Sequence, residues 1–134
     1  MSTSFHVHVY FEAEQRSAAA QLREALAARF PHARLGRIHD RAVAFHPAPM
    51  YQVTLDRVAL GTLIPWLQHH RADLSVLVHP LLGDVVAEHL EDAIWLGRPL
   101  ELDEERLRAA SSARDVAGTP TGPDRTILRI DASA

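Results

Sequence analysis

The sequence predicts an α+β fold, because strand-like and helix-like segments alternate along its 134 residues. Apolar and polar side chains alternate in residues 5–11 and again in residues 51–55, and residues 74–78 form a short apolar run. These patterns are typical of half-buried and fully buried strands. Residues 17–30 and 58–70 instead carry apolar side chains at helical spacing, which predicts two amphipathic helices between the strands.

The order of these segments indicates one architecture. A short strand is expected at residues 33–38, before a loop at 39–49, and a third helical segment is expected at 83–96. Pro65 lies inside the second helix and is expected to kink or split it. The order favours a ferredoxin-like sandwich (βαββαβ) with an antiparallel sheet, helices on one face and an extra C-terminal helical segment. The other face of such a sheet is expected to be uncovered and free for a ligand or a second subunit.

The chain is expected to divide near residue 102. Residues 1–102 are long enough for one ferredoxin-like domain with its own core. Residues 103–134 are expected to form a C-terminal extension that is partly flexible. Within it the pattern predicts a charged helix at 104–114, a Gly/Pro/Thr-rich linker at 117–123 and a late edge strand at 125–131.

Composition excludes several classes of protein. The net charge is -3 with histidine neutral and there is no block of lysine or arginine, which argues against nucleic acid as a partner. The apolar stretches are too short to cross a bilayer, and the N-terminus has no charged-then-apolar signal region, so a cytoplasmic protein is expected. The absence of cysteine rules out disulfides and thiolate nucleophiles. Any metal would therefore have nitrogen and oxygen ligands, which suit iron, manganese, zinc or copper.

Histidine is the residue type that points to a site, with nine in the chain. His6 and His8 share one face of the first strand, and this face is opposite to that of the apolar residues between them. In a ferredoxin-like sheet the last strand runs antiparallel beside the first, so His79 is expected near His6. His46 is expected to arrive from the loop that leads into the third strand. Imidazole is the commonest metal ligand, so these four residues predict a metal or catalytic cluster.

A histidine-rich chain also places imidazoles on a sheet face by chance, and this simpler interpretation stays open. His32, His69 and His70 are expected to be exposed to solvent. His89 lies in the third helical segment, and the pattern assigns it no role.

Several motifs, in order from about residue 5 to about residue 100, resemble those of the DOPA 4,5-dioxygenase family. They are His6-Val7-His8-Val9-Tyr10, Gly36-Arg37-Ile38-His39-Asp40, His46-Pro47, Met50-Tyr51-Gln52-Val53, Pro65-Trp66-Leu67, Leu77-Val78-His79-Pro80 and Trp95-Leu96-Gly97. The resemblance implies a ferredoxin-like fold, often dimeric, and extradiol cleavage of a catechol such as DOPA by iron(II) and dioxygen. The sequence departs from the family's pattern at Phe45, at Leu82 and Val85, and at Glu88.

The resemblance and the alternation of side chains along the strands together suggest the metal ligands. His8, His46 and His79 are expected to hold Fe(II), or another divalent metal such as zinc in the purified protein. His6 is expected to be the catalytic acid/base or an alternate ligand. Whether a carboxylate, from Glu12 or Glu88, completes the metal shell is left open.

The expected substrate contacts follow from the same two arguments. Tyr10 and Gln52 are expected to form hydrogen bonds with the substrate. Arg71, or alternatively Arg37, is expected to pair with a substrate carboxylate. The expected partners are a small aromatic substrate and dioxygen, with neither nucleic acid nor a membrane, in a protein that is a homodimer.

Two alternatives to an enzyme remain. One is a non-catalytic ferredoxin-like dimer that binds a metal or a small aromatic ligand. The other is a structural dimer whose histidines only line the interface.

Overall fold

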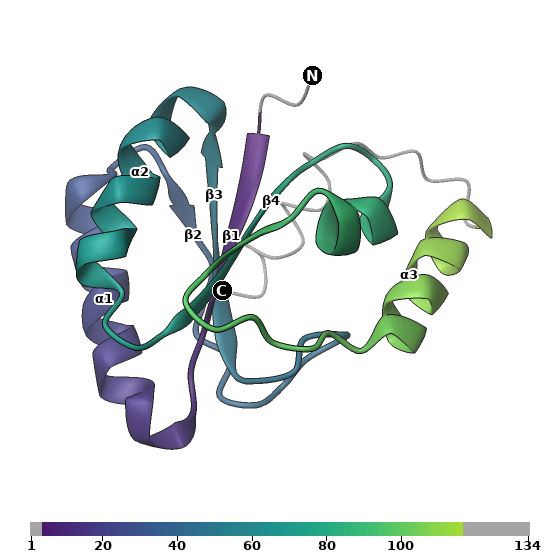
Figure 1. Ribbon diagram of the computed structural model, residues 1–134, viewed down its shortest axis with the longest axis horizontal. Helices are drawn as coiled ribbons and strands as arrows, with labels where there is room; N and C mark the ends of the chain where they lie inside the picture. The colour runs from purple at the N-terminus through teal and green to yellow at the C-terminus, as the bar shows by residue number, and fades with distance from the viewer. Residues whose placement is uncertain (1–3, 117–134) are drawn as a thin grey trace.

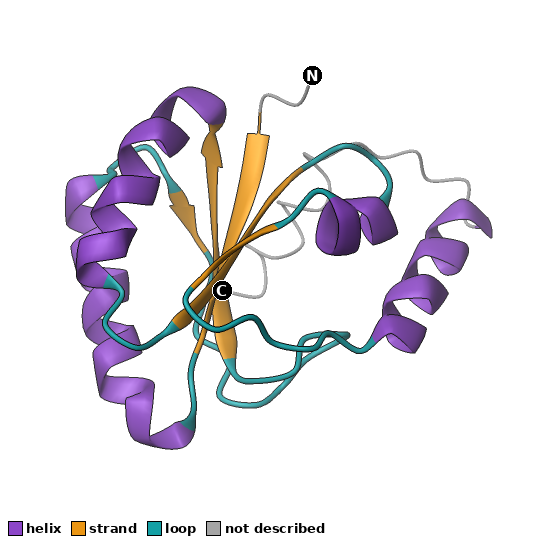
Figure 2. Ribbon diagram, viewed as in Figure 1, coloured by secondary structure: helices purple, strands orange, loops and turns teal. Residues whose placement is uncertain are grey.

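The structure is a computed structural model that describes residues 4–116, and it contains one sheet with helices on both sides (Figures 1 and 2). The sheet has the order β2-β3-β1-β4-β5. Its strands are β1 (Ser4–Tyr10), β2 (Arg34–Leu35), β3 (Met50–Asp56), β4 (Ser75–Pro80) and β5 (Ile94–Leu96). The helices are α1 (Arg16–Arg29), α2 (Arg57–His70) and α3 (Glu104–Val116), with short turns η1 (Ala13–Gln15) and η2 (Ala87–Glu91).

The ferredoxin-like prediction is confirmed by this strand order. The central strand β1 pairs antiparallel with β3 on one side and with β4 on the other, and β2 lies at the edge beside β3. The two long helices and three of the strands begin and end within two residues of their expected limits. The strand expected at 33–38 is shorter, because only two of its residues pair with β3.

The prediction of a helix at residues 83–96 is wrong for much of that range. One turn of π-helix forms η2, and the chain then extends as β5, which pairs antiparallel with β4. Ile94 and Trp95 are β-branched and aromatic, so they suit an edge strand better than a helix. Gly97, at a φ of +78°, turns the chain away after β5.

Helix α2 runs unbroken through Pro65, so the expected split does not occur. Leu63 and Leu67, on either side of the proline, are fully buried and hold both halves of the helix on the sheet. The helix begins at Asp56, whose carboxylate accepts a hydrogen bond from the Ala59 amide at 2.8 Å. Packing and capping together outweigh the hydrogen bond that proline removes.

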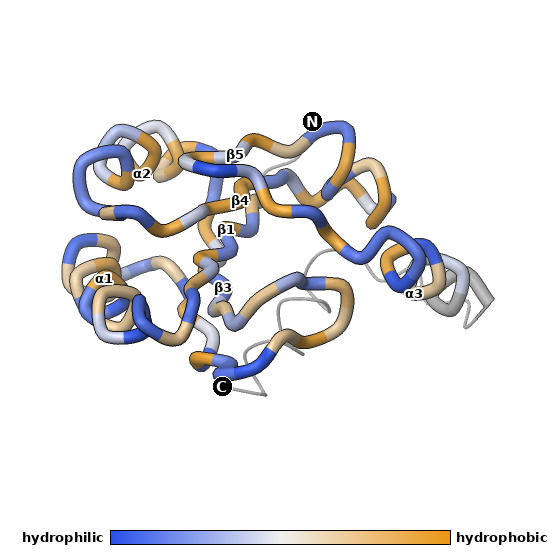
Figure 3. Tube along the Cα trace, turned by 60° about the horizontal axis from the view of Figure 1, so that its bottom comes forward, coloured by the Kyte–Doolittle hydropathy of each residue, from blue (hydrophilic) through white to orange (hydrophobic). Residues whose placement is uncertain are grey.

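The main core lies between the sheet and helices α1 and α2, because alternate side chains of the strands point to that face. Val7 and Val9 of β1 and Val76 and Val78 of β4 pack there with the leucines of the two helices. Figure 3 shows both helices on the same side of the stacked strands. The side chains between these valines therefore point to the opposite face.

The expectation that this opposite face is uncovered is wrong. Figure 1 shows η2, drawn in green before α3, and α3 itself on the side of the sheet away from α1 and α2. A second apolar cluster forms on this side from Tyr10, Ala48, Met50, Leu77 and Leu102. The polar side chains of the same face are consequently buried rather than exposed.

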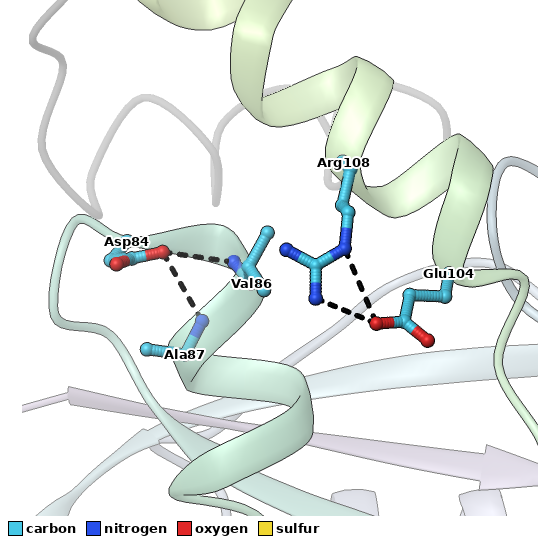
Figure 4. A network of polar contacts seen from close by, with 5 residues as sticks. All are labelled: Asp84, Val86, Ala87, Glu104 and Arg108. Atoms are coloured by element: carbon cyan, nitrogen blue, oxygen red, sulfur yellow. Dashed lines mark hydrogen bonds and ion pairs between the residues drawn. The ribbon is translucent and has the colours of Figure 1, made fainter.

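Local hydrogen bonds begin the two helical segments that lie on this side (Figure 4). The Asp84 carboxylate accepts from the amides of Val86 and Ala87 at 3.1 Å each, which caps the turn before η2. Arg108 donates to Glu104 one turn earlier in α3, at 2.6 Å.

Of the predicted C-terminal extension, α3 confirms the charged helix, while the expected linker and late strand lie outside the described residues. None of the described helices is both long and apolar enough to cross a membrane.

Candidate metal centre

Three imidazoles meet on the buried second face of the sheet. His6 and His8 come from β1, and His79 lies directly opposite His6 on β4. Their exposed fractions are 2%, 2% and 1%. Strand parity brings them together, as the sequence predicts, because all three point away from the core that α1 and α2 cover.

The spacing of these three residues suits a single metal ion. Each offers one ring nitrogen, and the three nitrogens lie within 4.8 Å of one another. The Nε2 atoms of His8 and His79 are 3.1 Å apart. An ion bound at about 2.0–2.1 Å by two neighbouring imidazoles holds their nitrogens roughly 3 Å apart. The His8–His79 pair therefore has the separation expected of adjacent ligands.

A second group of candidate ligands shares His79. It contains Glu88 and His89 from η2, again with ligand atoms within 4.8 Å of one another. The rings of His79 and His89 are 3.9 Å apart between centroids. The Glu88 carboxylate accepts hydrogen bonds from the amides of Leu82 and Gly83 at 2.6 and 2.7 Å, which fixes its position.

Neither Glu88 nor His89 could be placed from the sequence. The pattern at 83–96 does not indicate which residues of the segment face the sheet. In the structure the π-helical turn η2 carries both residues beside His79, and π-helical turns often occur at functional sites. The available signal was the Glu-His pair itself, placed shortly after a strand that ends in a histidine.

Backbone carbonyls orient two of the rings. His79 Nδ1 lies 2.9 Å from the Pro80 carbonyl, and His89 Nδ1 lies 2.8 Å from the Val85 carbonyl. A carbonyl only accepts, so each Nδ1 carries a proton, and the neutral His79 ring has its lone pair on Nε2. Metal-binding histidines are commonly oriented by hydrogen bonds of this kind.

His8 is left with an unsatisfied atom in either neutral form. If its Nε2 donates to the lone pair of His79, its Nδ1 is a buried acceptor, and this atom has no hydrogen-bond partner among residues 4–116. If its proton is on Nδ1 instead, two lone pairs face each other at 3.1 Å and a buried donor is unpaired. An unpaired buried polar group costs about 1–3 kcal/mol. A cation between the two Nε2 atoms would remove the repulsion, so these residues fit a divalent metal.

Burial keeps the imidazoles of the cluster neutral. It lowers the pKa of His6 and of His46 to about 3, and nearby imidazoles lower both further. The pKa values of His8 and His79 fall well below 6.5 for the same reasons, burial first. A neutral ring is the form that binds a metal, so the site does not need to release protons at neutral pH.

His46 lies beside the three imidazoles but outside both groups of candidate ligands. Its ring centroid is 4.6 Å from that of His8. Its Nδ1 is 2.7 Å from the hydroxyl of Tyr10, which is buried and stacks on Trp95. Burial also raises the pKa of Tyr10, so its hydroxyl stays protonated.

The remaining expected site residues divide between the cluster and elsewhere. Gln52 lies at the cluster, with its amide nitrogen 3.3 Å from His6 Nε2. Arg71 is at the end of α2, where it donates to the carbonyl of Leu74 at 3.0 Å, at the opposite end of β4 from His79. Arg37 is exposed. The three histidines expected in solvent, His32, His69 and His70, are exposed.

The fold and the site together define a ferredoxin-like α+β protein with a buried imidazole cluster suited to a metal. The chain belongs to the Dopa 4,5-dioxygenase family, whose sequence pattern matches residues 5–106. The matched range includes every candidate ligand.

Three known proteins resemble the chain. A 21.2 kDa uncharacterised protein of Botryotinia fuckeliana is 36% identical over 111 residues, covering 75% of this chain and 61% of its own. The DOPA 4,5-dioxygenase of Amanita muscaria is 27% identical over 111 residues, covering 77% of this chain and 49% of its own. The chain thus spans about half to three-fifths of the length of these curated relatives.

A crystal structure from Nostoc punctiforme, described as a candidate dioxygenase, shares the fold. It superposes with a TM-score of 0.79 at 44% identity, covering 82% of this chain and 95% of that one. The family and this structure support a dioxygenase, and the buried histidines could hold its metal.

Proposed function

We propose that this protein is an iron(II)-dependent extradiol dioxygenase that opens the ring of a catechol such as DOPA. The observation that carries the proposal is the His8–His79 pair, whose Nε2 atoms are 3.1 Å apart. The His8 Nδ1 atom is buried and has no hydrogen-bond partner within the described part of the chain. Family membership supplies the reaction class. Imidazole ligands with a nearby carboxylate are the donor set that suits non-haem iron(II).

Under this proposal His6, His8 and His79 would hold the iron. Of the two roles expected for His6, acid/base or alternate ligand, this assignment takes the second, because its ring nitrogen belongs to the same group as those of His8 and His79. Glu88 and His89 provide a second set that shares His79. Bound iron(II) would lower the pKa of a catechol hydroxyl and bring the catechol and dioxygen into one coordination sphere.

The chain's own residues would prepare the site for this chemistry. The Pro80 carbonyl holds the His79 ring in the tautomer that binds a metal. Gln52 contacts His6 from β3 and lies within 3.5 Å of Thr54. With its amide oxygen toward the ring, Gln52 would accept from His6 Nε2–H and leave the lone pair of His6 Nδ1 for the iron. Apolar side chains around Tyr10 and Leu77 exclude water from one side of the cluster, which strengthens its electrostatic interactions.

Ring opening after addition of oxygen is the direct test. The protein is loaded with iron(II) without air, mixed with DOPA or another catechol, and exposed to ¹⁸O₂. The visible spectrum and the product mass are then followed. A yellow ring-opened product whose new carboxylate carries a labelled oxygen atom supports the proposal; the second labelled oxygen enters an aldehyde, where it exchanges with water. Stoichiometric iron binding without product from several catechols contradicts it.

One observation favours a second function, a non-catalytic metal-binding protein. The three imidazoles are at most 2% exposed, and closed sites are typical of structural metals. The same experiment separates the two functions, since a structural site binds the metal tightly without consuming oxygen.

The homodimer and the cytoplasmic location stay predictions. The homodimer prediction rests on the family resemblance and on an uncovered sheet face, and the burial of that face removes the second of these arguments. Sedimentation of the full chain would measure the oligomeric state directly.

A further inference from the structure

The loop that carries His46 is held over the sheet by contacts that do not involve the metal ligands. His39 and Met50 exchange two backbone hydrogen bonds at 2.8 and 3.1 Å. The Phe45 carbonyl accepts from the Asp103 amide at 2.9 Å, and the Ala44 carbonyl accepts from Arg106 at 3.2 Å. The position of His46 is therefore determined by the protein backbone before any metal binds.

Tyr10 determines which nitrogen of His46 carries the proton. Within the described part of the chain, the hydrogen-bond partner of its hydroxyl is His46 Nδ1, at 2.7 Å. A phenol has one proton to donate, and leaving it unpaired inside the protein is costly. The hydroxyl therefore donates to Nδ1, and the neutral His46 ring carries its own proton on Nε2.

An imidazole nitrogen that carries a proton has no lone pair for a metal. With Nδ1 accepting from Tyr10 and Nε2 protonated, neither nitrogen of His46 is available as a ligand. The geometry agrees, because His46 belongs to neither group of candidate ligands although its ring lies 4.6 Å from that of His8.

We propose that His46 is a hydrogen-bond donor to an oxygen of the bound catechol beside His8, and that Tyr10 is the residue that positions it. This inference rests on the proposed function and replaces the expected ligand role of His46. The Nε2–H group would donate to a catechol oxygen that has lost its proton, and such charge-assisted bonds are short and strong. The donor is already in place when the charge develops, so little reorganisation is required.

Two substitutions of His46 separate a donor from a ligand. Gln places an amide N–H near the position of Nε2, whereas Ala removes the donor. Both variants are expected to bind zinc(II) with nearly the affinity of the unchanged protein, measured against a chromophoric chelator. Binding of 4-nitrocatechol to the zinc-loaded protein should weaken about tenfold or more in His46→Ala, because a hydrogen bond to a charged group is lost. His46→Gln should retain most of the binding.

The tautomer gives a readout that does not depend on activity. In the zinc-loaded protein labelled with ¹⁵N, long-range ¹H–¹⁵N spectra should show the His46 proton on Nε2. In Tyr10→Phe this preference should weaken, while zinc affinity stays nearly constant and 4-nitrocatechol binding falls in part. A structural role of Tyr10 alone would change the melting temperature without changing the tautomer.

The outcomes distinguish this inference from the proposed function. Loss of zinc binding in His46→Ala, a proton on Nδ1, or equal 4-nitrocatechol affinity in His46→Ala and the unchanged protein overturns the donor role. Failure of the unchanged protein to bind 4-nitrocatechol also overturns it. Absence of ring opening, with the tautomer and binding results as expected, overturns the proposed reaction alone.

Discussion

The Nε2 atoms of His8 and His79 lie 3.1 Å apart although 71 positions separate the two residues in the sequence. The pairing of β1 with β4 produces this contact, because His79 lies opposite His6 and His8 is the next residue on the same face. Two lone-pair nitrogens at this distance need a proton or a cation between them. The candidate metal site is thus a direct consequence of the strand register.

Removing His79 should strongly weaken metal binding. His79 belongs to both groups of candidate ligands, so His79→Ala should lower the affinity for iron(II) or zinc(II) by about a hundredfold or more. His69→Ala is the matched control, since His69 is exposed at the end of α2. Metal content after dialysis measures the effect, and equal content in the two variants would contradict the assignment.

Comparison of His6→Ala with His89→Ala distinguishes the two ligand groups. If His6, His8 and His79 hold the ion, His6→Ala should weaken zinc(II) binding by about tenfold or more, and by more than His89→Ala does. Competition with a chelator measures both affinities. The reverse order would assign the metal to His79, Glu88 and His89.

Much of this site could be predicted from the sequence, because strand parity is a local property. The alternation around Val7 and Val9 places His6 and His8 on one face, and the antiparallel order adds His79. The alternation of side chains along a strand does not indicate which segments cover that face. The cover depends on distant contacts, such as the Asp103 amide on the Phe45 carbonyl.

The same limit explains the residues that sequence reasoning placed differently. His89 and Glu88 reach the site through a π-helical turn, which has no clear sequence signal. The sequence predicts His46 among the ligands because its loop leads into the third strand, yet its proposed role depends on which of its nitrogens faces Tyr10. Arg71 follows α2, so its side chain lies at the opposite end of β4.

The metal-free protein should lose stability as the pH falls from about 6.5 toward 3. The folded-state pKa values of His6 and His46 are about 3, against 6.5 as the ordinary value. Between these limits the unfolded chain binds more protons, so acid favours unfolding, by about 1.4 kcal/mol per pH unit for each such histidine.

Urea unfolding of chelator-treated protein between pH 5 and pH 6.5 measures this slope. His46→Gln removes one of the buried imidazoles, so its free energy of unfolding should vary less steeply with pH. An equal slope in both proteins would show that His46 is not a buried neutral imidazole in solution.

The cap of α2 gives a prediction independent of the metal. Asp56 accepts from the Ala59 amide at 2.8 Å, so Asp56→Ala should lower the free energy of unfolding by about 1 kcal/mol. Asp56→Asn keeps an accepting oxygen and should cost less. Chemical denaturation measures both, and metal affinity should change little in either variant, since the Asp56 side chain is exposed and accepts from the first turn of α2.

Phe45 should control access to the cluster. Its ring centroid lies 4.5 Å from that of His46 and 4.8 Å from that of His89, and its carbonyl is held by Asp103. Phe45→Ala removes the ring but keeps the backbone contact. Because a covered ion leaves more slowly than an open one, a chelator should remove zinc(II) from Phe45→Ala several times faster, while the equilibrium affinity changes little. Phe45→Leu, which keeps most of the bulk, should be close to the unchanged protein, and equal removal rates in all three proteins would show that Phe45 does not shield the metal.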